Sequence, residues 1–171
     1  IRTQTGLDQF EMVGLDACLM GHVEVLSALA PHARYAVVSQ ETEPALGWAY
    51  TSFLQALLQN PDADGAALSR TIVDSYIEED QRIVDDQARA EFLRQGSPLG
   101  GFFGGFAQAS PEQLAQQMGA GSTLTAVDLS ALPGLLDSLN ELAYVLQGSD
   151  QRAVARARTY ALSFTSVFGP Q

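Results

Sequence analysis

The sequence is poor in several residue types that mark common classes of protein. Among its 171 residues are one cysteine, two histidines and nine basic side chains, all arginine, against 20 acids. One cysteine excludes a disulfide within the chain and leaves the cellular compartment open. The net charge of −11 argues against a nucleic-acid partner, because affinity for phosphates comes from basic side chains. No apolar run reaches about 18 residues, so we expect no membrane span.

Hydrophobic residues make up 46% of the chain, which is enough for one domain whose core buries roughly two-thirds of the extended surface. No repeat, low-complexity tract or linker divides the chain, so we take residues 1–171 as one domain. The excess of acids would attract cationic substrates, although acidity is also a common device for solubility. The chain starts at Ile1 without a methionine or a signal-like segment, which suggests a processed product or a fragment.

Apolar patterning predicts an alternation of strands and helices. Residues 10–17 are typical of a strand buried on both faces, and residues 35–39 of a second one. Helical spacing over residues 19–29 joins the two, so we expect a parallel pair. The later predicted elements are helices over 50–58, 64–94 and 132–146, a helix over 149–158 capped by Ser149, a strand over 123–129, and a strand or irregular packing over 160–168. This order favours an α/β fold.

Residues 97–106 interrupt the pattern with four glycines and three phenylalanines. We interpret this stretch as a loop with aromatic anchors, either a lid over a cleft or an ordinary flexible insertion. Ser110-Pro111-Glu112-Gln113 has the spacing of a capping box with Pro at the first helical position, which predicts a short helix to about Met118. Residues 97–121 are therefore interpreted as a glycine-rich loop and short-helix insertion.

Cys18 lies where the first predicted strand ends, in Val13-Gly14-Leu15-Asp16-Ala17-Cys18-Leu19-Met20-Gly21. Strand ends carry reacting groups in α/β folds, because the first turn of the next helix offers free N–H donors and a dipole that favours a thiolate. Asp16, two residues earlier, should face the same cavity. A carboxylate beside a sulfur disfavours the thiolate, so Asp16 is better suited to binding a substrate charge than to activation. The alternative is that Cys18 is only a small buried hydrophobe.

The pattern around Cys18 extends well beyond one cysteine. It comprises residues 13–21, Val23-Glu24-Val25, Val38-Ser39-Gln40-Glu41-Thr42-Glu43-Pro44, Gly47-Trp48-Ala49-Tyr50 and, further on, residues 122–129. Together these residues closely resemble the clostripain family of cysteine peptidases, strongly over 10–50, again over 122–140, and thinly in between. The resemblance implies a caspase-like three-layer α/β sandwich with a mainly parallel central sheet flanked by helices, of which this chain is the carboxyl-terminal, cysteine-bearing part.

The resemblance also implies roles for individual residues. Cys18 matches the family's nucleophile, with its backbone N–H as an oxyanion donor, and Asp16 matches the acid at the base of the specificity pocket. Members of the family cleave after Arg or Lys, which agrees with the attraction of a buried carboxylate for a cation. The family's catalytic histidine precedes the cysteine, in a His-Gly segment that nothing in residues 1–9 matches. His22 is close enough to Cys18 for contact in principle but on the wrong side of the turn, and His32 fits a surface residue.

We therefore expect a cysteine endopeptidase that cleaves peptides or proteins after Arg or Lys, with the histidine of its Cys-His dyad on an upstream chain of the same precursor. Such precursors are cut between the two segments, and if self-cleavage produced Ile1, the residue before it is Arg or Lys. Secretion is usual in the family, so we expect a secreted or cell-envelope protein of bacterial type. The alternative is a non-catalytic caspase-like module whose acidic cleft recognises basic peptides or a partner subunit.

Further candidates surround this constellation. Glu41 and Glu43 follow the second predicted strand, where Glu41 could line the rim of the pocket or both could hydrogen-bond backbone and shape the turn. Trp48 and Tyr50 could form a wall of the pocket against a guanidinium or could simply pack in the core.

The chemistry of a cysteine peptidase requires no cofactor. The resemblance leaves calcium open, and several acids are clustered between residues 78 and 86. Hard cations prefer clustered oxygen ligands, but these acids lack the spacing and the glycine of an EF-hand loop, so a solvated helix face is the simpler interpretation. We assign no residue as a metal ligand.

Overall fold

The computed structural model describes residues 2–43, 46–94, 110–119 and 122–161. Its centre is a three-stranded sheet in the order β1 (Phe10–Gly14), β2 (Ala33–Ser39) and β3 (Leu124–Asp128). β1 and β2 are parallel, with Met12 beside Tyr35, and β3 runs antiparallel to β2, with Val127 beside Ala36. The connection through α2 (Val23–Leu29) produces the parallel pair that the sequence predicts.

The other described helices are α1 (Arg2–Thr5), α3 (Tyr50–Gln59), α4 (Gly65–Ser75), α5 (Gln81–Val84), α6 (Asp86–Arg94), α8 (Pro111–Gly119), the 3-10 turn η1 (Leu129–Ala131), α9 (Leu132–Gly148) and α10 (Gln151–Thr159). Most of them lie where the sequence predicts a helix, whereas α1 is not predicted. The capping box of α8 forms as expected: Ser110 Oγ accepts from the Gln113 amide at 3.3 Å, and Gln113 Oε1 accepts from the Ser110 amide at 3.1 Å. The loop predicted over 97–106 and the end of the chain from 162 lie outside the described residues.

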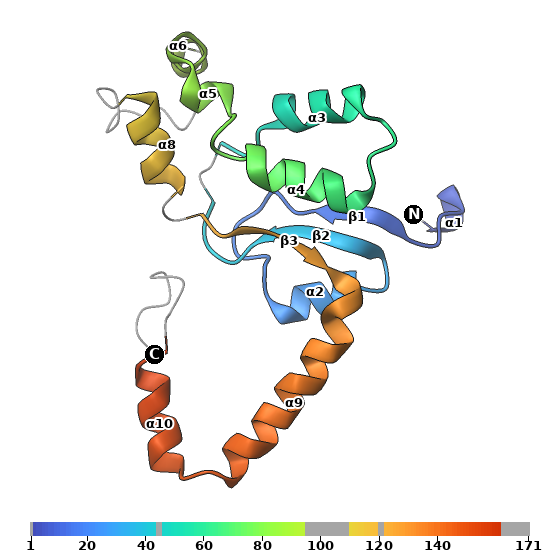
Figure 1. Cartoon of the computed structure of the whole chain (residues 1–171), viewed down its shortest axis with the longest axis vertical. Coiled ribbons are helices and arrows are strands. Elements are labelled where there is room, and N and C mark those ends of the chain that lie inside the picture. The colour runs from blue at the N-terminus through green and yellow to red at the C-terminus, as the bar shows by residue number, and fades with distance from the viewer. Residues whose placement is uncertain (1, 44–45, 95–109, 120–121, 162–171) are drawn as a thin grey trace.

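β2 is the central strand, and its alternating side chains enter two cores. Val37 packs with Ile72 of α4 on one face, whereas Val38 packs with Leu26 of α2 and Leu132 of α9 on the other. Figure 1 shows α3 and α4 over one face of the sheet and α2 with the beginning of α9 over the other. The helices and the mixed sheet thus form the expected α/β sandwich, with one parallel and one antiparallel pairing.

Three sequence predictions about elements are wrong. β1 is half-buried or exposed along its length rather than buried on both faces, because the described sheet ends at this strand. The single helix over 64–94 is broken into α4, α5 and α6, since Asp80 accepts from the Arg82 amide and Asp85 from the Ala88 amide, both at 2.8 Å. Such side-chain bonds to free N–H groups begin new helices. Asp150, rather than Ser149, caps α10.

Gly14 brings the end of β1 against a buried ring. A Cβ atom at this position would lie 2.6 Å from Cη2 of Trp48, so Gly14→Ala must displace the ring and is expected to lower the free energy of unfolding by about 1–3 kcal/mol. Gly134→Ala on α9 is the matched control, because nothing lies within 4 Å of its Cβ position and alanine favours helices. Urea unfolding checks this, and equal midpoints for both variants would contradict it.

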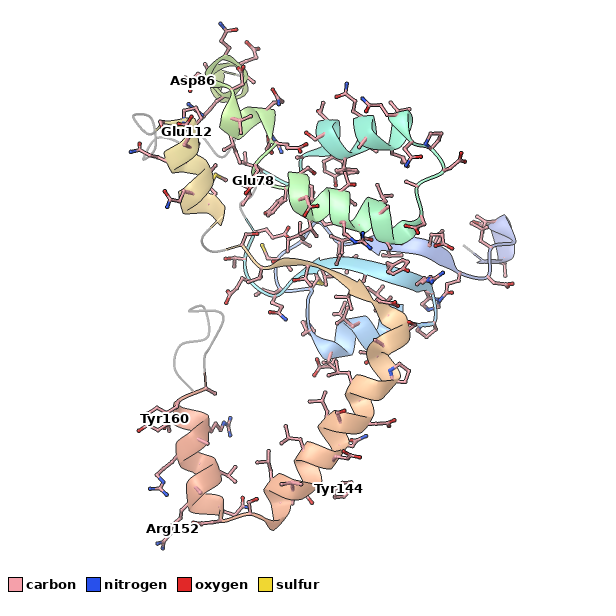
Figure 2. All side chains as sticks on the ribbon, in the orientation of Figure 1. Glu78, Asp86, Glu112, Tyr144, Arg152 and Tyr160 are labelled. Carbon is pink, nitrogen blue, oxygen red and sulfur yellow. The ribbon has the colours of Figure 1, made fainter. Side chains whose placement is uncertain are left out.

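α9 and α10 extend away from the sandwich (Figure 1). Figure 2 shows the side chains of both helices, among them Tyr144 and Tyr160, on this projecting pair. One set of apolar side chains on α9 is 40–65% exposed, namely Leu135, Leu139, Leu142, Val145 and Leu146. The described residues therefore leave an apolar stripe of α9 uncovered. Within the same ranges, no helix combines the length and apolarity that crossing a membrane requires.

Candidate active site

Cys18 lies in the turn between β1 and α2, and this turn is tied to β2 and to the residues after it. The tie consists of three backbone hydrogen bonds, from Leu15 N–H to Val37 O (2.9 Å), from Leu19 N–H to Glu41 O (3.1 Å) and from Gly21 N–H to Ser39 O (2.7 Å). Leu19 adopts a φ of 61°, a left-handed conformation that a bulky side chain rarely takes. The backbone is therefore fixed on both sides of Cys18, with a strained residue directly after it.

The helix after Cys18 begins later than the sequence predicts. α2 starts at Val23, with His22 as its N-cap, so Cys18 does not lie in the first turn of the helix. The prediction that the helix dipole stabilises a thiolate at Cys18 is therefore wrong. A loop amide takes that role, because the N–H of Glu43 donates to Cys18 Sγ at 3.2 Å. The same sulfur lies 3.8 Å from the Glu43 carbonyl oxygen, and Cys18 is exposed. Cys18 is thus an accessible sulfur with one N–H donor, not a buried hydrophobe.

Neither histidine supplies a base for this sulfur. His22 is 54% exposed and pairs with Glu24 at 3.1 Å, and His32 is exposed at the connection into β2. In the described part of the chain, neither ring hydrogen-bonds to Cys18. Both histidines fit the surface interpretation.

Asp16 is held by the segment that follows β2. Its Oδ2 accepts hydrogen bonds from the Trp48 amide at 3.1 Å and from the Tyr50 hydroxyl at 3.0 Å. Burial and this bond to Asp16 raise the pKa of Tyr50, so the phenol stays a donor. No described residue donates to Oδ1. Asp16 is therefore a fixed carboxylate with one oxygen open to a ligand.

Arg82 positions the segment that holds Asp16. Its guanidinium donates to the carbonyls of Leu46 at 2.6 Å and Trp48 at 3.1 Å, and its Nε donates to Asp80 at 2.9 Å. Asp80 is only 4% exposed, so this acid is not the solvated one that the sequence suggests. The sequence gives little sign of the Arg82 contacts, because the carbonyls lie more than 30 residues away along the chain.

Gly47 completes this segment. It has a φ of 71°, and a Cβ atom there would lie 2.8 Å from Asp16 Oδ2. Only glycine combines that conformation with so close a carboxylate.

Of the two acids after β2, Glu43 rather than Glu41 approaches the site with its side chain. Glu41 acts through its backbone, since its N–H donates to Thr123 Oγ1 at 2.7 Å and its carbonyl accepts from Leu19 and Ser39. Both carboxylate oxygens of Glu43 are buried, and burial, followed by the charge of Asp16, raises its pKa from 4.5 to about 7. The turn-shaping alternative therefore describes Glu41, and the sequence did not distinguish the two.

Trp48 packs in the core and also borders the site. It is 4% exposed and lies against Tyr50 and Phe53 with ring centroids 6.5 and 6.4 Å away. Its indole N–H has no hydrogen-bond partner among the described residues. The two sequence interpretations, pocket wall and core packing, thus apply to different parts of the same side chain.

The acids between residues 78 and 86 do not gather into a metal site. Glu78 and Asp86 are exposed and well separated in Figure 2, and Asp80 is paired with Arg82. Across the described ranges, no group of three or more His, Cys, Asp or Glu side chains is arranged to hold a metal ion.

One family model and one solved structure match the chain. The model of the clostripain family matches residues 3–94, which is more than half of the chain and includes Asp16, Cys18 and Glu43, whereas residues 122–140 lie outside the match. The solved structure of a B. fragilis cysteine protease is similar at 23% identity, with a TM-score of 0.46, over 78% of this chain. The chain spans 43% of the length of that protein. No curated protein matches the sequence.

Proposed function

Because the chain belongs to the clostripain family, we propose that it supplies the nucleophile and the specificity acid of a cysteine endopeptidase that cleaves after Arg or Lys. The observation that carries this proposal is the turn after β1, which holds an exposed sulfur at Cys18 and a fixed carboxylate at Asp16. A thiolate is a strong nucleophile toward a carbonyl carbon. A carboxylate with an open oxygen favours a cationic side chain at the cleavage site.

The proposed reaction follows from these positions. The Cys18 thiolate attacks the carbonyl carbon after the basic residue, and the Cys18 N–H, which donates to no described residue, receives the oxyanion. A histidine gives its proton to the leaving amine, and the C–N bond breaks to leave a thioester. Water then attacks the thioester and gives a proton to the same histidine, the C–S bond breaks as the acid product leaves, and the thiolate and the protonated histidine are restored.

We propose that this histidine belongs to an upstream chain of the same precursor. Neither His22 nor His32 hydrogen-bonds to Cys18. Among the described residues β1 pairs only with β2, while Met12 and Val13 on β1 are half-buried. An apolar strand with an unpaired edge suits the addition of a further strand. The free edge supports an upstream segment beside β1.

Mass spectrometry of the intact protein tests the two-chain arrangement. We expect denaturing conditions to release a second chain that contains a His-Gly segment, and native conditions to keep it bound. A single species that retains full activity would exclude the upstream chain.

The rival function is a non-catalytic module that binds basic peptides. It predicts binding without cleavage and without reaction at Cys18. An arginyl chloromethyl ketone separates the two functions, because alkylation of Cys18 requires a competent nucleophile beside an acidic pocket. Secretion and calcium dependence stay predictions from the family.

A further inference from the structure

Next to Asp16 lies a second carboxylate that the proposed mechanism does not use. Glu43 contacts Cys18 through its backbone, with its N–H 3.2 Å from the sulfur. Its side chain is turned inward, so that both carboxylate oxygens are buried and have no hydrogen-bond partner among the described residues. Buried carboxylates are normally hydrogen-bonded or paired, because burial without a partner is costly. Glu43 therefore has two acceptor oxygens without a described donor.

Two buried donors near this carboxylate are also unpartnered. Trp48 and Tyr76 are each 4% exposed, and neither the indole N–H nor the phenol O–H has a described partner. The indole N–H of Trp48 is close enough to Glu43 to oppose the rise of its pKa in part, but it does not reach the carboxylate with the geometry of a hydrogen bond. Burial and the charges of Glu43, Asp16, Cys18 and Asp80 raise the pKa of Tyr76. Unpartnered donors and acceptors thus surround one spot beside the nucleophile.

The charges around this spot are not balanced within the described residues. The groups that interact electrostatically with one another here are Glu43, Asp16, Cys18, the phenols of Tyr50 and Tyr76, and the Asp80–Arg82 pair. Arg82 is the cation among them, and its guanidinium is engaged by Asp80 and by the carbonyls of Leu46 and Trp48. A cation with several N–H donors would neutralise these charges and donate hydrogen bonds to the carboxylate oxygens.

We propose that Glu43 is a second specificity-determining residue, whose carboxylate together with that of Asp16 receives the cationic side chain of the substrate. This inference rests on the proposed function. Asp16 has one open oxygen, because Oδ2 already accepts from Trp48 and Tyr50. Both oxygens of Glu43 lack a described partner but are covered, so this side chain has to turn toward Asp16 to receive the cation. A cation between them would neutralise the exposed charge of Asp16 and the buried charge of Glu43 at once.

The affinity of Asp16 and Glu43 for a cation then depends on pH. The pKa of Glu43 is raised to about 7, first by burial and second by Asp16. Below that pH Glu43 is neutral and the cation meets the charge of Asp16 alone. Above it Glu43 is ionised and the cation meets two charges. Cation affinity therefore rises with pH through this range.

The test measures binding of benzamidine, a cation throughout this pH range, to the intact protein carrying Cys18→Ala, so that ionisation of the sulfur plays no part. We expect the Kd to fall by about tenfold from pH 6 to pH 8, as for a gain of roughly one pKa unit of interaction. Adding Glu43→Gln to the Cys18→Ala protein should raise the Kd for benzamidine and leave it nearly independent of pH. Adding Glu78→Gln, which removes an exposed acid after α4 (Figure 2), should preserve the pH dependence. Neutral benzamide should show none.

Thermal unfolding without ligand is the second measurement. Because the pKa of Glu43 rises from 4.5 when unfolded to about 7 when folded, the folded state holds the extra proton in this window. Stability therefore falls as pH rises from about 4.5 to 7. Glu43→Gln should lack this decline, and Glu43→Ala serves if the glutamine variant folds poorly. A decline that persists in both variants would contradict the charge regulation.

The outcomes separate the sources of the cation. If a cation of an upstream chain covers Glu43, Glu43→Gln leaves the benzamidine Kd unchanged at every pH and weakens the association of the chains, which overturns the inference. If the wild-type protein cleaves after Arg, but Glu43→Gln added to the Cys18→Ala protein leaves the benzamidine Kd unchanged, the inference about Glu43 fails and the proposed function stands. If no cysteine-dependent cleavage after Arg or Lys occurs at all, the proposed function fails.

Discussion

Replacing Cys18 by alanine should reduce cleavage after Arg by roughly 10⁴-fold or more, because no other described side chain at the turn after β1 can form the thioester. Substrate binding should survive, since the acid Asp16 and its donors Trp48 and Tyr50 are untouched. The measurement compares turnover of an Arg-containing peptide with binding of the same peptide to the variant.

The fold should tolerate this change. Cys18 is exposed and loses one hydrogen bond, from the Glu43 amide, which is worth about 1 kcal/mol. Ser138→Ala on α9 is a suitable control, because it also removes one side-chain hydrogen bond, to Gly134 O, far along the chain from the site. The arginyl chloromethyl ketone should add its mass to the control and not to the Cys18→Ala protein. Normal turnover by the latter would end the peptidase proposal.

Asp16→Asn should lower kcat/KM for Arg substrates by about 10²–10³-fold, or about 3–4 kcal/mol, which lies within the range for removing one partner of a charge pair that the bound substrate buries. Asparagine keeps a side-chain oxygen that can accept from the Trp48 amide and the Tyr50 hydroxyl. The shape of the site is thereby retained while its charge is lost. Cleavage of a matched substrate with a neutral residue, such as citrulline in place of arginine, should change little.

The control for Asp16→Asn is Asp137→Asn on the exposed surface of α9, which removes the same charge from the protein. If only the net charge mattered, both variants would lose activity equally. Kinetic assays with the Arg and citrulline peptides separate these effects. Unchanged cleavage after Arg by the Asp16→Asn protein would refute the role of this carboxylate, whereas equal losses with both peptides would indicate a structural role.

The two acids of the site were unequally accessible to sequence reasoning. Asp16 could be singled out because it lies two residues from Cys18 and within the same motif. Glu43 shares a motif with Glu41, and nothing in the spacing says which side chain turns inward. The backbone decides this, since Glu41 is engaged by Thr123, from a segment more than 80 residues away.

The helix boundaries show the same limit. Apolar spacing correctly predicts α3 and α9, and the capping box predicts α8, because each of these signals lies within the segment that forms the helix. It misses the breaks around Asp80, because the helical period continues across them. The Asp80–Arg82 pair is stabilised by carbonyls of residues 46–48, which no local pattern contains.

By itself, the sequence determined the alternation of strands and helices, the family motif and the choice of Cys18 and Asp16 as candidates, because these follow from local periodicity and from residues close together in the chain. Only the tertiary structure decided that Cys18 takes its N–H from Glu43 rather than from a helix, and that Arg82 and Gly47 position Asp16. It also decided that Glu43 is buried without a described partner. The physical reason is that hydrogen bonding and burial depend on which distant segments meet. Residues 41–48 are held by contacts from the turn after β1, from α5 and from the residue before β3.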